Sequence, residues 1–140
     1  MKLFKKILEA VKIKARKLPA PFQDRQPDIQ LWRDCFAGDF ALADRILCLF
    51  CDAFMFASGD RHRFRPDDTV WEIYRAVYPS RETPDCLENN FFIKGLEKAF
   101  AIKFDDARLE TIESFQQIVV AIKRAQQSTG GNAGSPRALA

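Results

Sequence analysis

Apolar residues in this chain recur three and four positions apart along several segments, and no segment alternates apolar and polar residues as a β-strand does. This period is typical of helices that bury one face, so the sequence predicts an all-α protein built as a helical bundle. N-cap residues separate the segments, among them Asp39, Thr69 with Glu72, and Asp85 with Glu88. The predicted helices cover residues 28–36, 39–57, 69–77 and 86–101, and a last one begins at Thr111 or Ser114 and ends before Gln126.

The length and composition fit one soluble-type helical domain. The chain has 140 residues, of which 47% are hydrophobic and 29% charged, so it can bury a sizeable core. No apolar run approaches the ~20 residues of a membrane-spanning helix, because Asp44, Arg45 and Asp52 interrupt the most apolar stretch. The first 17 residues lack the apolar segment and cleavage site of a secretory signal. With four Cys and no sign of export, we expect reduced thiols and a cytoplasmic location.

A single His and the absence of metal-ligand spacing restrict the chemistry. Most metalloenzyme and His-dependent catalytic schemes need several such residues. We therefore expect neither an enzyme nor a bound metal.

Positive charge is concentrated at the N-terminus. Residues 1–17 carry seven Lys and Arg against one Glu, a net charge of +6, and because the whole chain carries +3, the remainder carries −3. Apolar residues recur here at helical spacing, with Lys5, Lys6 and Lys12 on the other face, which predicts a basic amphipathic helix. Such a helix could lie on an anionic inner-membrane surface, contact a protein partner, or pack on its own domain. Nucleic acid is not the partner that we expect.

Prolines and small residues mark the domain boundaries. Pro19 and Pro21 break the N-terminal helix, which makes residues 18–27 a linker. Residues 126–140 are rich in Gly, Ser and Ala and have nothing to bury, so we expect a flexible tail there. Residues 28–125 remain as the helical domain.

The second half of the chain carries motifs of a known family. Asp85-Cys86-Leu87 opens a helix, Leu96-Glu97-Lys98-Ala99-Phe100 follows it, and Thr111-Ile112 opens the last helix. In this order and register the motifs resemble the D-S-L, L-E-x-x-F and T-I/T-V segments of acyl carrier proteins. The resemblance covers residues 40–124 and is to small, divergent bacterial carrier-like proteins. It implies an acyl-carrier-like helical bundle, to which the basic N-terminal helix is an addition.

One departure from the family changes the expected function. The Ser of D-S-L attaches phosphopantetheine in carrier proteins, and Cys86 stands at that position here. The family resemblance also implies an acidic second helix, whereas this helix mixes Glu88 and Glu97 with Lys94 and Lys98. We therefore interpret the domain as a carrier scaffold without its cofactor, acting by protein–protein interaction as an adaptor or immunity-type protein. The alternative is a true carrier that uses Cys86, flanked by Asp85 and Leu87, for phosphopantetheine or an acyl group.

Cys86 could also have a chemistry of its own. In the first turn of a helix the dipole lowers a thiol pKa and favours the thiolate. Asp85 and Glu88 oppose this effect, and no His accompanies the Cys in sequence. An inert residue in place of Ser is the reading that we favour.

Three further groups of residues have a structural and a functional reading. Arg61, Arg63 and Arg65 could contact phosphate or an acidic surface, or could belong to a solvated loop. Cys48 and Cys51 have C-x-x-C spacing, but inside an apolar helix we expect core thiols rather than zinc ligands. Several Phe residues are expected in the core, although a Phe-lined bundle could admit an acyl chain. These are Phe91, Phe92, Phe100 and Phe104.

Overall fold

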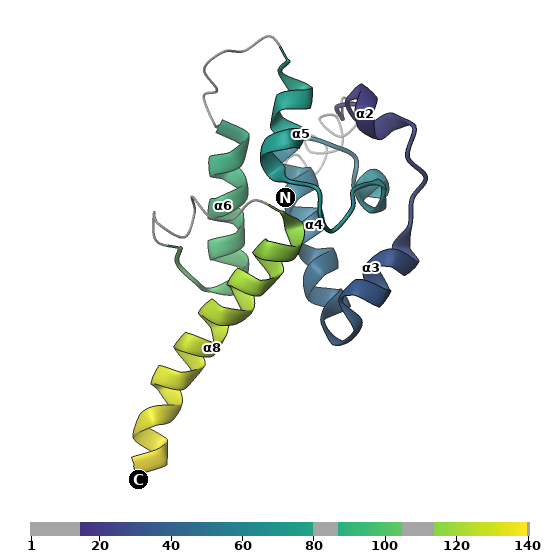
Figure 1. The fold of residues 1–140 in the computed structure, drawn as a ribbon. Coiled ribbons are helices and arrows are strands. Elements are labelled where there is room, and N and C mark those ends of the chain that lie inside the picture. The colour runs from purple at the N-terminus through teal and green to yellow at the C-terminus, as the bar shows by residue number, and fades with distance from the viewer. Residues whose placement is uncertain (1–14, 80–86, 105–113, 140) are drawn as a thin grey trace, which may run out of the picture.

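The central element of the computed structural model is α4 (Phe40–Phe54), around which the other helices pack (Figure 1). The structure describes residues 15–79, 87–104 and 114–139, with side chains as far as residue 127. Within these ranges the elements are helical and no β-strand occurs, which confirms the all-α class. They are α2 (Ala20–Gln23), α3 (Ile29–Cys35), η1 (Ala37–Asp39), η2 (Ser58–Arg63), α5 (Val70–Val77), α6 (Leu87–Phe100) and α8 (Phe115–Leu139). No helix in the described ranges is both long and apolar enough to cross a membrane.

Capping side chains define where several helices begin. The Asp28 carboxylate accepts a hydrogen bond from the backbone N–H of Leu31, and the Thr69 hydroxyl accepts one from the N–H of Glu72. Ser114 caps α8 by accepting from the N–H of Gln117. These are the positions expected from sequence for the starts of α3 and α5, and Ser114 is one of the two expected for the last helix. Asp39 precedes α4 as expected, but its carboxylate binds Lys123 Nζ at 2.6 Å rather than capping the helix.

Phenylalanine rings form the centre of the core. Phe50 on α4 is fully buried and meets the rings of Phe64, Phe92 and Phe115 edge-on, with centroids 5.0 to 5.4 Å apart. These partners come from the loop after η2, from α6 and from α8. The indole N–H of buried Trp32 donates to the Phe64 carbonyl at 2.8 Å, so the polar atom of this ring is satisfied inside the core.

The segment expected to be a linker packs on the bundle. Residues 18–27 contain α2, and Leu18 and Phe22 are each only 4% exposed. A proline in the first turn is compatible with a helix because its missing N–H would have no intrahelical partner. The prolines therefore start a helical turn here, and the apolar residues beside them draw the segment onto the core.

The last helix is longer than the sequence analysis expected. α8 continues to Leu139 through the segment for which a flexible tail was expected, and its end points away from the other helices (Figure 1). Ala125, Gln126 and Gln127 are good helix formers and carry the helix past residue 125, whereas nothing in the structure explains its continuation through Gly130, Gly131 and Pro136. The basic helix expected for residues 1–17 lies outside the described residues as far as residue 14.

Candidate functional site

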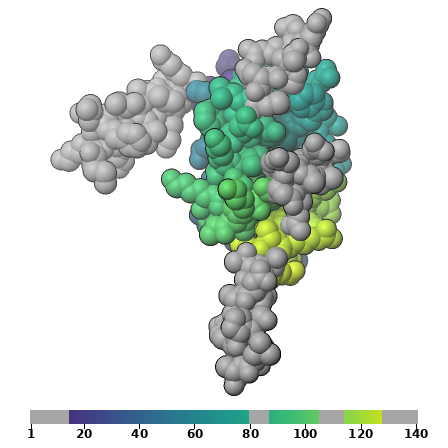
Figure 2. Space-filling model, turned by 90° about the vertical axis from the view of Figure 1, so that its left-hand side faces the viewer, coloured from purple at the N-terminus to yellow at the C-terminus, as the bar shows by residue number. Residues whose placement is uncertain are grey.

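The exposed side of α6 carries two large apolar side chains. Phe92 and Leu96 are buried against α4, whereas Leu87 is 52% and Phe91 57% exposed. Figure 2 looks onto this side of the molecule, where the green atoms of α6 form the front of the bundle. Phe91 was expected in the core. Adjacent residues of a helix point about 100° apart, and Phe92 takes the inward direction, so Phe91 faces outward.

Three polar residues continue the same exposed side. Asn90, Lys94 and Lys98 are exposed, and the spacing 87–91–94–98 follows one side of a helix. We call these five side chains the α6 face: Leu87, Asn90, Phe91, Lys94 and Lys98. It is apolar in its first half and basic in its second half.

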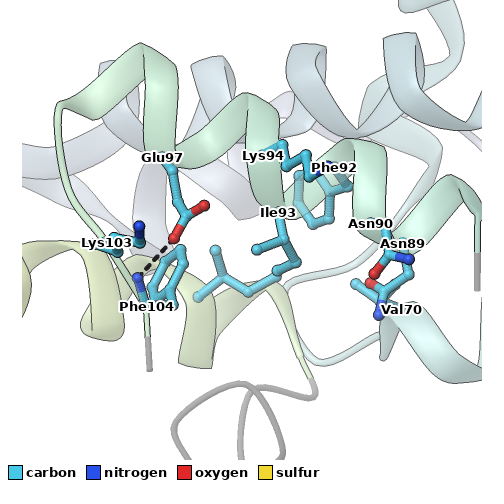
Figure 3. A pocket seen from close by; sticks show the side chains of 10 residues that line it. Val70, Asn89, Asn90, Phe92, Ile93, Lys94, Glu97, Lys103 and Phe104 are labelled. Carbon is cyan, nitrogen blue, oxygen red and sulfur yellow. Dashed lines mark hydrogen bonds between the residues drawn. The ribbon is translucent and has the colours of Figure 1, made fainter. Parts of the chain in front are cut away.

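A cavity lies beside this face. It has a volume of about 290 Å³ and an apolar floor to which Phe92, Ile93, Phe104 and Ile118 contribute. Its rim is polar, with Asn89 and Asn90 near Val70 at one end and Glu97 and Lys103 at the other (Figure 3). The Glu97 carboxylate accepts the backbone N–H of Phe104 at 2.9 Å and so fixes the chain that follows α6.

The first turn of α6 is tied to the N-terminal segment. The Tyr78 hydroxyl donates a hydrogen bond to Glu88 Oε1 and accepts one from Arg16 Nη2 at 3.1 Å. Arg16 also lies 3.7 Å from the Glu88 carboxylate and over the Tyr78 ring. The bond to Glu88 is the main reason that the pKa of Tyr78 is raised, and burial adds to it. Glu88 is therefore paired through Oε1 within the chain, and its side chain is only 12% exposed, so it adds little negative charge to the α6 face.

The arginines of the 61–65 loop are paired within the chain. Arg61 binds the Asp44 carboxylate through Nε at 2.8 Å and Nη2 at 3.2 Å, and Arg63 pairs with Asp60 at 3.2 Å. Arg65 pairs with Asp28 at 3.2 Å. The Arg61 pair attaches η2 to α4, the Arg63 pair lies within η2, and the Arg65 pair attaches the loop after η2 to the N-cap of α3. The three arginines expected as anion contacts therefore have structural partners.

His62, the one His of the chain, joins the same cluster. Its Nε2 lies 2.7 Å from Asp44 Oδ1, and its ring stacks on Phe40. Burial raises the pKa of Asp44, but the hydrogen bonds and charges of Arg61 and His62 outweigh burial, and the pKa is lowered from its ordinary 3.8. The cluster holds an ionised carboxylate at neutral pH.

The cysteines of α4 are not poised for metal or thiolate chemistry. Cys51 is fully buried, and burial raises the pKa of its thiol to about 12. Burial likewise raises the pKa of Cys48. Among the described residues, no three His, Cys, Asp or Glu side chains gather as metal ligands do.

Other sequence-derived candidates lie outside the described residues. These are Asp85 and Cys86, and Lys5, Lys6 and Lys12. Of the D-S-L-like motif the structure therefore places only Leu87, as the first residue of α6.

The sequence analysis missed the outward direction of Phe91 and the contact of Arg16 with α6. The first had a signal, since Lys94 and Lys98 stand three and seven positions after Phe91 and so share its side of the helix. The second had none, because Arg16 and Glu88 are far apart in sequence.

Comparison with known proteins finds no relative. No protein-family model matches the chain, and neither the curated proteins nor the solved structures include a significant match.

Proposed function

We propose that this chain is a non-enzymatic cytoplasmic protein that binds a protein partner, as an adaptor or immunity-type factor, through the α6 face. The observation that carries the proposal is the exposure of Leu87 and Phe91, which lie one helical turn apart on a helix whose other large apolar side chains are buried or half-buried. Adjacent large apolar side chains on a small protein are typical of interaction sites. We further propose that the bundle is an acyl carrier scaffold that has lost its carrier function.

The composition of the α6 face supports this function. The centre of a protein interface is apolar, often aromatic, and a polar rim surrounds it. Phe91 supplies an aromatic anchor, and Asn90 and Lys94 stand beside it as exposed polar residues. A contact of this kind needs no catalytic group.

Photo-crosslinking in the source cell tests the proposal. A benzoylphenylalanine at position 91 keeps an aromatic side chain there and reacts with whatever covers it. We expect a discrete protein adduct from this position. The matched control is the same residue at position 29, because Ile29 is also an exposed apolar residue, at 41%, but lies on α3. An absent adduct at position 91, or the same adduct from position 29, contradicts the proposal.

A carrier function through Cys86 is the second candidate. The cavity beside α6 supports it, because an apolar floor begins only a few residues after Cys86 and could accept an acyl chain. Intact-mass measurement of the protein from its source cell separates the two functions. A phosphopantetheine or acyl adduct that maps to Cys86 and is lost in Cys86→Ala supports the carrier function, and an unmodified mass opposes it.

A further inference from the structure

Gly95 is a residue that the fold of the described chain does not require. It stands in the middle of α6, where glycine is less favourable than alanine because of its greater loss of backbone freedom. Its φ is not positive, and a Cβ added there would meet no atom within 4 Å. Neither a special backbone conformation nor close packing against the described residues therefore explains the missing side chain.

The position of Gly95 relates it to the α6 face. It lies four residues after Phe91, so Phe91, Gly95 and Ala99 form one row along the helix surface, a large side chain followed by two small ones. Small residues let a second helix approach the backbone closely, while the ring beside them fills the space next to it. The two small residues leave a shallow depression beside the Phe91 ring, against which a crossing helix could pack.

The charged side chains beside this row indicate which charge the partner surface carries. Lys94 and Lys98 are exposed, and neither forms an ion pair within the described residues. Lys103 at the adjacent cavity is exposed as well. Of the two described carboxylates of α6, Glu88 is paired with Arg16 and Tyr78, whereas Glu97 accepts from the neutral Phe104 N–H and keeps its negative charge. Among the described residues, Lys94, Lys98 and Lys103 therefore outnumber the one unpaired carboxylate of Glu97, and this excess of positive charge favours an acidic surface.

We propose that the partner segment is an acidic amphipathic helix that crosses α6 at Gly95. Its apolar side covers Leu87 and Phe91, and its carboxylates meet Lys94 and Lys98. This inference rests on the proposed function and adds the chemistry of the partner to it.

A membrane surface is the competing occupant of a face that is apolar and basic. Two exposed apolar side chains offer little area for insertion, and a lipid surface gains nothing from a missing Cβ at Gly95. The helix partner accounts for both features.

Two synthetic helices provide the probe. Both are about 20 residues long and side-chain stapled, with the same leucine side; one carries Glu and the other Lys beside it. Binding to the full-length protein is followed by peptide fluorescence anisotropy, and the site by amide NMR shifts. We expect the acidic helix to bind about tenfold more tightly than the basic one, to weaken with salt, and to shift the amides of residues 87–100. Equal affinities, or shifts confined to other elements, overturn the proposal, as do α6 shifts produced by phosphatidylglycerol vesicles and not by the acidic helix.

Gly95→Ala separates binding from folding, because the substitution is expected to stabilise the fold and to weaken binding of the acidic helix. The substitution is expected to raise the melting temperature by about 2–4 °C, since the methyl group meets open space and alanine favours the helix. The same methyl group is expected to weaken binding of the acidic helix about tenfold, because it stands where the partner backbone approaches. Unchanged or tighter binding by this stabilised variant overturns the crossing at Gly95.

Charge reversal gives the second variant. The double variant Lys94→Glu, Lys98→Glu is expected to reverse the preference for the acidic helix, so that the basic helix binds more tightly. Lys17→Glu, which changes an exposed lysine outside α6, is the control and leaves the preference as it was. A preference that survives the double reversal overturns the proposed charge contact.

The cellular crosslink distinguishes the failure of this inference from the failure of the proposed function. If the position-91 adduct contains a partner segment that is neither helical nor acidic, partner binding stands and the acidic helix is wrong. If no protein is crosslinked at position 91, the proposed function itself fails.

Discussion

Arg61 binds the carboxylate of Asp44 with two nitrogens, Nε at 2.8 Å from Oδ1 and Nη2 at 3.2 Å from Oδ2. His62 Nε2 lies 2.7 Å from the same Oδ1, so the single carboxylate of Asp44 on α4 binds two side chains of η2. Asp44→Ala leaves a guanidinium and an imidazole without their acceptor. We expect a loss of about 1–3 kcal/mol in the free energy of unfolding, measured by urea denaturation. Asp52→Ala is the control, since Asp52 is exposed on the same helix and is expected to change the stability little.

The same carboxylate makes the stability depend on pH. The pKa of Asp44 is lowered in the folded protein from its ordinary 3.8, because Arg61 and His62 outweigh the opposing effect of burial. A lowered folded-state pKa contributes stability that is complete above the unfolded value and is lost as the pH falls through the folded value. We therefore expect the wild type to lose stability more steeply below pH 3.8 than Asp44→Asn does. Denaturation curves at a series of acidic pH values measure this, and parallel pH profiles would contradict it.

Phe50 is the ring on which the core converges. It is fully buried and contacts aromatic rings from three other parts of the chain. We expect Phe50→Ala to lower the free energy of unfolding by about 3–5 kcal/mol, through lost burial and the cavity left behind. Trp71→Ala removes a larger ring that is 46% exposed and should cost far less. Equal costs in thermal or urea denaturation would mean that the core is not centred on Phe50.

Local sequence signals predicted the helices well. The apolar period anticipated α3, the Thr69 cap anticipated α5, and Ser114 was one of the two residues expected to open α8, because these signals act within one turn of the chain. The all-α class followed from the same period.

Contacts between distant residues could not be predicted in this way. The sequence left Arg61, Arg63 and Arg65 open between anion binding and a solvated loop, and neither reading names their acidic partners, which lie on α4, on η2 and at the N-cap of α3. The burial of Leu18 and Phe22 depends on the shape of the bundle, as does the contact of Arg16 with Glu88. For the site, the sequence predicted the helix that carries it, but assigned Phe91 to the core together with Phe92. Both residues are phenylalanines, and only Phe92 points toward the core.

Ala101 ends α6 in a conformation that favours glycine. Its φ is 52°, in the left-handed region, where a Cβ is strained. We expect Ala101→Gly to raise the free energy of unfolding by about 0.5–1 kcal/mol, because the relief of strain exceeds the entropy that glycine adds to the unfolded chain. Ala99→Gly, two residues earlier inside the helix, is the matched control and should destabilise by about 1 kcal/mol. If both substitutions destabilise, α6 does not end as described.

The cysteines should differ in their reaction with iodoacetamide. Cys35 is exposed, whereas Cys51 is fully buried with a pKa of about 12, so its thiol is both inaccessible and protonated. In the folded protein we expect alkylation of Cys35 first and of Cys51 only after urea unfolding, as measured by peptide mass spectrometry. Comparable rates at the two sites under native conditions would refute the burial of Cys51.

The same labelling experiment bears on the carrier function. A carrier that uses Cys86 needs a thiol that a transferase can reach, so Cys86 must then react at a rate near that of Cys35. In protein whose intact mass shows no adduct, a rate for Cys86 as slow as that of Cys51 removes the second candidate function and leaves partner binding through the α6 face. A fast rate shows that Cys86 is accessible, and the intact mass of the protein from its source cell then decides between the carrier function and partner binding.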